Sequence, residues 1–339
     1  MWVCPDASAQ ADDASLYDSA YIESYNGLVM PRFLVTRKSS GMSYSNLRGG
    51  YSLRYQPNTT FSVGLGFTYR FATLNLSAGV LKPQESRGST RNLDAQFHTY
   101  GRRFVGDFLI QFYKGFHLPD RRFGNSTREF YVRPDLAVGA LGGSVQYVLN
   151  NRKFSYRAAF QQTEWQKKSA GTFLVGVELF MGRFRADSTI VPQELQSLEV
   201  DGMRKMRFLE FGPNAGYAYT WVFKKFFINT GATIGLNAGL NRYDDGSEKE
   251  TFAGVSPNTS LRLSSGYNVR QWGVNVFYQS RALRLPQFHN RVVAINAGTL
   301  RVNFIYRLQP SNKMKKLLRP IEKVEEHILE KVEEYLPQN

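Results

Sequence analysis

Residues 60–70 read Thr-Phe-Ser-Val-Gly-Leu-Gly-Phe-Thr-Tyr-Arg, and residues 231–240 read Gly-Ala-Thr-Ile-Gly-Leu-Asn-Ala-Gly-Leu. In both stretches large apolar residues alternate with Gly, Ser, Thr or Asn, which is the two-residue period of a β-strand. The alternation recurs through most of residues 28–309, for example at 72–80 and 291–308. The pattern therefore predicts an all-β chain of about fourteen antiparallel strands, with twelve as the alternative count.

The second face of these strands decides the fold class. It carries Gly, Ser, Thr, Asn, Gln and isolated Arg, whereas a face in bulk water usually carries many Lys and Glu. The apolar face is continuous, and aromatic residues such as Tyr55, Trp221 and Tyr306 gather near strand ends, as in a lipid-facing band. We therefore expect a closed transmembrane β-barrel, because closure alone pairs every backbone group of a sheet in hydrocarbon.

Composition excludes several other classes of protein. The 339 residues include 43 Lys+Arg and 28 Asp+Glu, a net charge of +15, and 42% are hydrophobic, too many for a disordered chain. One Cys and four His argue against a disulfide scaffold and a structural zinc site. No phosphate loop, His-Glu-x-x-His motif or calcium loop occurs, so we expect no cofactor and no metal. The basic residues are spread along the chain, which argues against nucleic-acid binding.

The two ends differ from the middle. Small residues at Ala7, Ala9 and Ala11 fit the end of an export signal, so we interpret residues 1–11 as a signal-peptide stub, or else as a short disordered leader. Residues 12–27 are then a periplasmic segment and 28–309 the barrel.

Residues 310–339 predict an amphipathic helix. Its apolar stripe recurs at helical spacing, at Leu317, Ile321, Val324, Ile328, Val332 and Tyr335. Long polar loops at 185–205, 242–250 and 282–290 alternate with tight turns, which predicts an outer-membrane location with the C-terminus in the periplasm. The helix (311–336) either docks a periplasmic or membrane partner or packs on its own barrel.

One stretch is more distinctive than a generic strand: Asn151-Arg-Lys-Phe-Ser-Tyr-Arg-Ala-Ala-Phe-Gln-Gln-Thr-Glu-Trp-Gln-Lys-Lys-Ser-Ala-Gly-Thr-Phe-Leu-Val-Gly176. Together with Gly101-Arg-Arg-Phe104, Gln111-Phe-Tyr-Lys-Gly115 and Arg133-Pro-Asp-Leu136, it resembles a family of uncharacterised, exported, barrel-like proteins of Bacteroidetes-type bacteria. The resemblance covers about residues 21–308. It implies an outer-membrane location and no particular activity.

Within that stretch, residues 153–161 read as a strand that places Arg157 and Gln161 toward the lumen. The link 162–170 then carries Trp165, Lys167 and Lys168. An aromatic ring beside two cations can seat an anionic sugar or a lipid head group. The alternative is a link that folds across the barrel mouth, with Trp165 as an anchor and the lysines in solvent.

Strand parity also predicts which polar side chains line the lumen. The candidates for selectivity are Arg54, Arg157, Gln161, Arg262, Arg301 and Arg307. Rings of Arg favour anions, so we expect a channel for small anionic solutes. The same charges can instead pair across the lumen, in a non-conducting barrel that docks a partner through its terminal helix. Cationic loop ends are expected to contact outer-membrane lipid and lipopolysaccharide.

An enzyme is the least favoured reading. His98 with Asp94 or Asp107 is the one inward-facing constellation that resembles catalytic chemistry, such as lipid modification. No nucleophile with a recognisable neighbourhood accompanies it. We therefore assign no catalytic residue.

Overall fold

The protein is described by a computed structural model over residues 17–70, 72–123, 129–198, 203–244 and 249–321. The strands are, in chain order, β1 (Ile22–Ser24), β2 (Val29–Asn46), β3 (Tyr51–Tyr55), β4 (Phe61–Tyr69), β5 (Ala72–Gly79), β6 (Arg91–Tyr100), β7 (Phe104–Leu118), β8 (Tyr131–Val148), β9 (Glu164–Gln166), β10 (Ala170–Arg185), β11 (Lys205–Phe223), β12 (Phe226–Asp244), β13 (Lys249–Asn268), β14 (Trp272–Arg284) and β15 (Arg291–Tyr306). Four short helical turns are η1 (Glu85–Arg87), η2 (Arg121–Phe123), η3 (Arg157–Gln161) and η4 (Gln193–Leu198).

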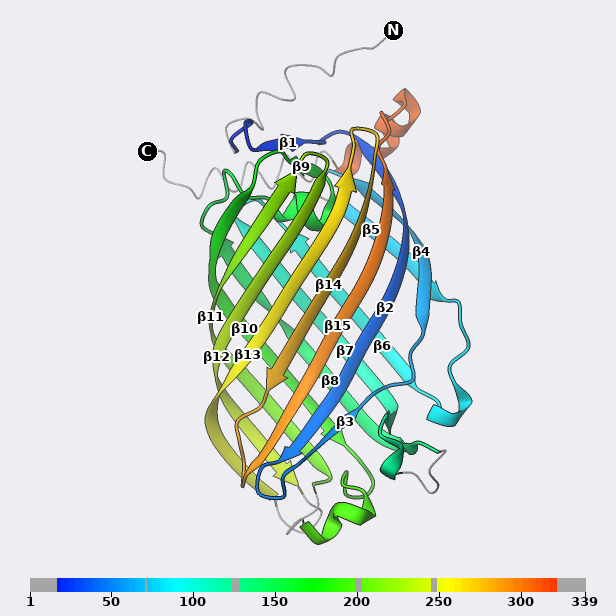
Figure 1. The fold of residues 1–339 in the computed structure, drawn as a ribbon, viewed down its shortest axis with the longest axis vertical. Helices are drawn as coiled ribbons and strands as arrows, with labels where there is room; N and C mark the ends of the chain where they lie inside the picture. The colour runs from blue at the N-terminus through cyan, green and yellow to red at the C-terminus, as the bar shows by residue number, and fades with distance from the viewer. Residues whose placement is uncertain (1–16, 71, 124–128, 199–202, 245–248, 322–339) are drawn as a thin grey trace.

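Thirteen of the strands form one curled antiparallel sheet (Figure 1). Its order is β5-β4-β2-β15-β14-β13-β12-β11-β10-β8-β7-β6, with β3 also paired to β2. The first and last long strands of the chain, β2 and β15, therefore pair with each other, from Arg291 opposite Asn46 to Ile305 opposite Arg32. The two edges of the sheet are β5 and β6, which follow one another in the sequence.

β3 and β4 occupy one position in the sheet. Both run antiparallel to β2, β3 against Met42–Asn46 and β4 against Val29–Arg37. Pro57 lies in the break between them, where it has no N–H to donate to a ladder. The gap between β3 and β4 is therefore a break within one strand position. The order given above has twelve positions, which matches the alternative count.

The side-chain distribution of the sheet is the reverse of that in a soluble sandwich. Leu65, Leu76 and Ile234 point outward and are 70%, 68% and 64% exposed, whereas the intervening Thr68 and Asn237 are completely buried inside. The alternation expected from the sequence is thus confirmed, with the apolar face outward. A lipid environment accounts for this arrangement, and bulk water does not.

The two ends of the curled sheet differ. One end, the short-turn end, has the turns 101–103, 224–225 and 269–271 and an outer row of aromatic residues that includes Trp221, Tyr267, Trp272 and Tyr306. The other, the long-loop end, has the link 186–204. The predicted long loop at 242–250 is wrong, because β12 continues to Asp244 and β13 begins at Lys249.

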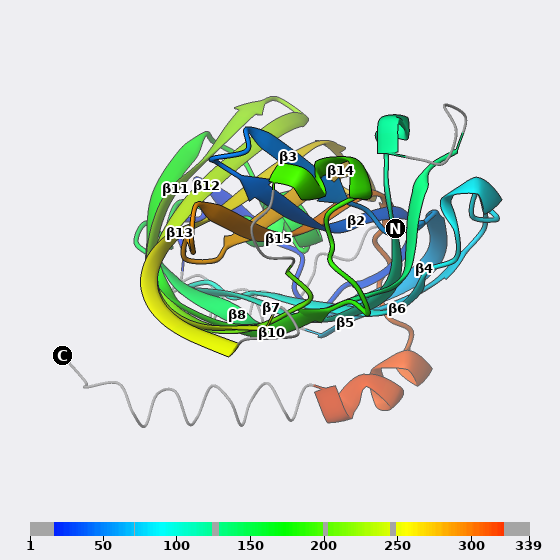
Figure 2. The ribbon, with the colours of Figure 1, turned by 90° about the horizontal axis from the view of Figure 1, so that it is seen from below.

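A helix at residues 312–321 lies outside the curled sheet, as Figure 2 shows. Leu318 is buried in a cluster with Val29 and Tyr69, whereas Leu317 of the predicted stripe is 79% exposed. The described part of the helix thus packs on its own sheet. The rest of the predicted stripe (324–335) and the predicted signal stub (1–11) lie outside the described residues. None of the described helices is long and apolar enough to cross a membrane.

Candidate functional site

The unpaired edges of β5 and β6 border a cavity of about 800 Å³. Its lining includes residues of the outer surface, such as Leu76 and Phe97, as well as interior residues such as Arg301 and Asn303. The cavity therefore passes through the wall of the sheet. Backbone groups on an open edge are tolerated at membrane depth only where they are buried in protein or line a water-filled cavity. The edges of β5 and β6 border a cavity.

The lining changes character from outside to inside. Exposed Leu74, Leu76 and Phe97 form an apolar outer rim. The inner end is lined by Arg32 of β2 and Arg301 of β15, which lie next to each other in the sheet order. The cavity thus joins an apolar surface to a cationic interior.

The guanidinium groups of Arg32 and Arg301 have no ion pair with a described carboxylate. Arg32 donates to Thr68 Oγ1 and to the carbonyl oxygen of Gln161, the latter at 3.3 Å. Its Nε has no partner, although the residue is only 5% exposed. Arg301 donates from Nε to Thr36 Oγ1 at 3.0 Å and lies over the Phe277 ring. Two cationic groups with spare donors therefore face this space.

Side chains from the interior hold β6 in place across the opening. Lys38 Nζ contacts Asp94 Oδ1 at 3.0 Å and donates to the Asp94 carbonyl at 2.7 Å. Thr299 Oγ1 donates to Gln96 Oε1 at 3.0 Å. These contacts join β2 and β15 to β6 beneath β4 and β5, so the width of the opening is fixed from inside.

The short-turn end of the interior is closed by a plug, defined as residues 150–169 with β1. The plug contains the π-helical turn η3, and β1 pairs with β9 (Figure 1). Phe160 packs against Phe277 and Tyr100, and the carbonyl oxygen of Ala159 accepts from Ser264 and Asn275. The expected strand at 153–161 is therefore wrong. Arg157 and Gln161 do line the cavity, but they do so from this turn.

Glu164 secures the plug through a buried polar cluster. Its carboxylate accepts from Arg102 Nη2 at 2.5 Å and from Ser155 Oγ at 2.5 Å, and lies 3.4 Å from Arg157 Nη1. Arg102 belongs to the turn between β6 and β7. The cluster thus ties the plug to the strand pair that borders the cavity.

The predicted ligand contacts in the link have different surroundings. Trp165 packs beside a cluster containing Tyr25, Met30 and Ile305, while Lys167 and Lys168 are exposed. Lys168 Nζ lies 5.4 Å from the centre of the Tyr21 ring. The arrangement corresponds to the alternative reading, a link folded across the mouth with Trp165 as an anchor.

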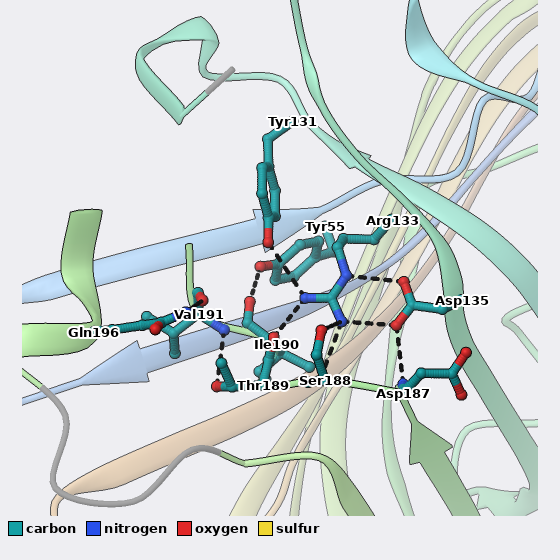
Figure 3. Close-up of polar contacts among 10 residues, drawn as sticks. All are labelled: Tyr55, Tyr131, Arg133, Asp135, Asp187, Ser188, Thr189, Ile190, Val191 and Gln196. Atoms are coloured by element: carbon teal, nitrogen blue, oxygen red, sulfur yellow. Dashed lines mark hydrogen bonds and ion pairs between the residues drawn. The ribbon is translucent and has the colours of Figure 1, made fainter. Parts of the chain in front are cut away.

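The long-loop end is closed by the segment after β10 (Figure 3). Ile190 and Val191 are buried in the apolar cluster that fills this mouth. Tyr55 donates to the carbonyl oxygen of Ile190, and Arg133 donates to the carbonyl oxygen of Thr189 at 2.6 Å. Asp135 aligns the same guanidinium from 2.7 Å. Both mouths of the curled sheet are therefore occupied by the chain itself.

Between the mouths, charged side chains pair across the interior. Asp107 accepts from Arg262, from Arg281 at 3.2 Å, and contacts His98 Nδ1 at 2.7 Å. The expected proximity of His98 and Asp107 is thus confirmed. Asp94, the alternative partner, is engaged instead by Lys38, Gln96, Gln111 and Tyr113. Asp107 of β7 thus contacts side chains of β6, β13 and β14 across the interior.

The other predicted lumen residues differ in outcome. Arg262 is buried, and Arg307 is buried beneath the plug, where it donates to the carbonyl oxygen of Gln162 at 3.1 Å. Arg54 is exposed between the buried Leu53 and Tyr55, so its predicted lumen position is wrong. At the long-loop end the interior is apolar, and the polar face of a strand there points outward. The expected outward Tyr55 is wrong for the same reason.

Arg32 is a cavity residue that the sequence prediction missed. Its neighbours Phe33 and Val35 are apolar and outward, so strand parity gave a signal, but the inward Leu34 obscured the alternation. No group of three His, Cys, Asp or Glu side chains that could hold a metal ion occurs in the part of the chain that the structure describes.

Among solved structures, the outer-membrane protease OmpT of Escherichia coli covers 83% of this chain and 97% of its own, at 9% identity and a TM-score of 0.37. A Pseudomonas aeruginosa FadL homologue (82% and 90% covered, 9% identity, TM-score 0.26) and the Ralstonia pickettii toluene transporter TbuX (84% and 90%, 6%, 0.27) are also similar. Sequence identities and TM-scores this low do not show that an activity or a ligand is shared.

No curated protein matches the sequence. A family profile described as "Domain of unknown function (DUF4421)" matches residues 16–308, which includes the whole curled sheet and the plug. The chain therefore belongs to the DUF4421 family.

Proposed function

We propose that this protein is an outer-membrane β-barrel that binds an anionic amphiphile through its wall, between β5 and β6. The observation that carries the proposal is the cavity between the two unpaired edges, apolar outside and cationic inside. The outward apolar face supports the membrane location.

The ligand class follows from the shape of the charge distribution. A carboxylate, sulfate or phosphate group fits the spare donors of Arg32 and Arg301, since guanidinium groups bind such anions through paired hydrogen bonds. A single alkyl chain then extends past Leu76 and Phe97 to the lipid-facing surface. Its apolar area contributes about 0.8 kcal/mol per buried methylene.

Binding is measured by the fluorescence of dansyl-undecanoic acid with the purified full chain in neutral detergent. We expect Arg301→Gln and Arg32→Gln to weaken binding about tenfold, and Arg54→Gln, a matched exposed arginine, to leave it unchanged. Dodecanoate should compete, whereas dodecanol and acetate should compete weakly. Equal competition by dodecanoate and dodecanol, with unchanged binding in both cavity variants, contradicts the proposal.

A gated channel for small anionic solutes is the second candidate. It is favoured by the buried charges, six arginines against four carboxylates among the described residues. Because both mouths are occupied, we propose that conduction requires displacement of the plug or of the segment held by Arg133. Single-channel recordings test it. Anion-selective steps that appear in Glu164→Gln, and whose anion selectivity weakens on adding Arg301→Ala, support the channel. A silent but folded Glu164→Gln variant contradicts it, as does unchanged selectivity in the double variant.

We also propose that a partner protein docks on the terminal helix, and one residue supports this role. Leu317 is exposed although it lies next to Leu318, which packs on the sheet, so the helix has an unused apolar position. Co-purification with the full chain and with a Leu317→Lys variant tests this role. We propose binding and transport, not catalysis, because Asp107 is occupied by two guanidinium groups.

A further inference from the structure

A cationic patch lies on the outer face of the sheet at the long-loop end. It consists of exposed side chains from five strands: Arg91, Lys114, Arg183, Arg185, Lys205, Arg207 and Arg242. Each has the same strand parity as the exposed apolar residues of its own strand, such as Met181 on β10 and Leu209 on β11. The patch therefore borders the apolar outer surface directly.

The register of the strands brings like charges together. Arg183 of β10 is opposite Arg207 of β11, and Arg207 is opposite Arg242 of β12, so three arginines stand in one row across three strands. Adjacent strands are about 4.8 Å apart, and like charges directly opposite each other destabilise a sheet. These three arginines have no ion pair with a described residue. A bound polyanion would offset this repulsion.

The next row toward the loops extends the patch along the sheet. Arg185 is opposite Lys205 on one side and Ala137 on the other, and Ala137 is opposite Lys114, which pairs with Arg91. The small side chain of Ala137 leaves room between the flanking cations. There the surface has a hollow of about 420 Å³ whose lining includes Gly139 and the four flanking cations Arg91, Lys114, Arg183 and Arg185.

One register step away from the loops, the surface becomes apolar. Met181 is opposite Leu209, and Leu209 is opposite Leu240, so an apolar row runs parallel to the arginine row. All three side chains are exposed. A lipid with phosphate groups above several acyl chains matches both rows at once, because its charged and apolar parts are stacked in the same order.

We propose that this patch binds the phosphate groups of a phosphorylated glycolipid of the outer leaflet, lipopolysaccharide, with the acyl chains along the apolar row. The proposal rests on the outer-membrane location proposed above and places the long-loop end at the outer leaflet. It is independent of the cavity between β5 and β6, which lies at other residues.

The test uses the full chain in neutral detergent and hexa-acylated bisphosphorylated lipid A as the probe, with binding followed by native mass spectrometry. The variant is Arg183→Gln with Arg207→Gln and Arg242→Gln. The matched control is Lys224→Gln with Lys225→Gln and Arg270→Gln, which removes the same charge from exposed turns at the opposite end. We expect about a tenfold or greater loss of affinity in the first and none in the control.

Two further arms identify the source of the phosphate. Dephosphorylated lipid A should bind as weakly to the natural chain as lipid A binds to the triple variant. Inorganic phosphate at millimolar concentration should not displace lipid A. Equal affinity of the natural chain and the folded triple variant for lipid A overturns the proposal, as does full displacement by inorganic phosphate.

Cell-envelope fractionation separates this failure from failure of the proposed function. Folding of each variant is checked by heat-modifiable gel mobility. If the protein fractionates with the outer membrane but lipid A binds the triple variant as tightly as the natural chain, the proposed lipid site alone is wrong. If it does not fractionate there, the membrane location is wrong and both proposals fall.

Discussion

Gln56 and His117 are joined by two backbone hydrogen bonds, in which the N–H of each donates to the carbonyl oxygen of the other at 2.9 Å. This bridge connects the break between β3 and β4 to the end of β7. It lies at the long-loop end of the seam that β5 and β6 leave open. The opening between β5 and β6 thus has a backbone bridge at one end and the interior contacts of Lys38 behind it.

The imidazole of His117 gives the stability of the folded chain a pH dependence. His117 lies beyond the apolar outer surface, and burial together with the charge of Arg87 lowers its pKa to about 4. An unfolded His titrates near 6.5, so the unfolded chain binds more protons between these values, and stability falls as pH drops from about 6.5 to 4. We expect the thermal transition of the folded chain to move downward in that window. His117→Gln should flatten the dependence, and an equal slope in that variant would falsify this assignment.

Much of the sheet was predictable because the outward face is uniform. In the part of the chain that faces lipid, strand parity gave the correct face for Leu65, Ile234 and Arg262. The same rule misplaced Arg54, because the sheet continues beyond the apolar belt and there encloses an apolar core around Tyr55. At membrane depth apolar side chains point outward and polar side chains inward. Beyond the apolar belt, at the long-loop end, the apolar side chains point inward and the polar ones outward.

The plug was not predictable from alternation alone. Phe154, Tyr156 and Phe160 alternate with polar residues as in a strand, yet the segment forms a π-helical turn inside the sheet. Residues 153–161 contain no Val, Ile or Thr, the β-branched residues enriched in strands, although their Phe and Tyr residues are also common in strands. That absence is the available signal. Arg102, one of the partners of Glu164, comes from a turn 62 residues away in sequence and could not be paired with it without the fold.

Glu164→Gln should loosen the plug without unfolding the sheet. The change leaves Arg102 and Arg157 without their counter-charge in a buried site, where loss of one partner costs on the order of 3–5 kcal/mol. Trypsin should then cleave faster at Lys167 and Lys168. The control is Glu23→Gln on β1, which has no ion pair with a described residue; equal cleavage of both variants argues against a latch.

Asp107→Asn should destabilise the sheet more than any other single change in the interior network. Arg262 and Arg281 share this carboxylate, so its loss leaves two buried cations facing each other, at a cost of about 3–5 kcal/mol. His98→Ala removes one contact and should cost less. Heat-modifiable gel mobility gives the transition for each, with exposed Asp187→Asn as the neutral control. A stability of Asp107→Asn equal to that of the control would exclude the cross-link.

Two adjacent leucines test how the terminal helix is attached. Leu318 is 7% exposed against Val29 and Tyr69, whereas Leu317 is 79% exposed. Leu318→Ser should release the helix, because it removes a buried side chain worth about 2 kcal/mol of apolar contact. Trypsin cleavage at Lys315, Lys316 and Arg319 should accelerate several-fold in that variant. Leu317→Ser alters helix propensity equally but breaks no contact with the sheet, so it should match the natural chain. Acceleration in both variants would mean that helicity, and not packing on β4, protects this segment.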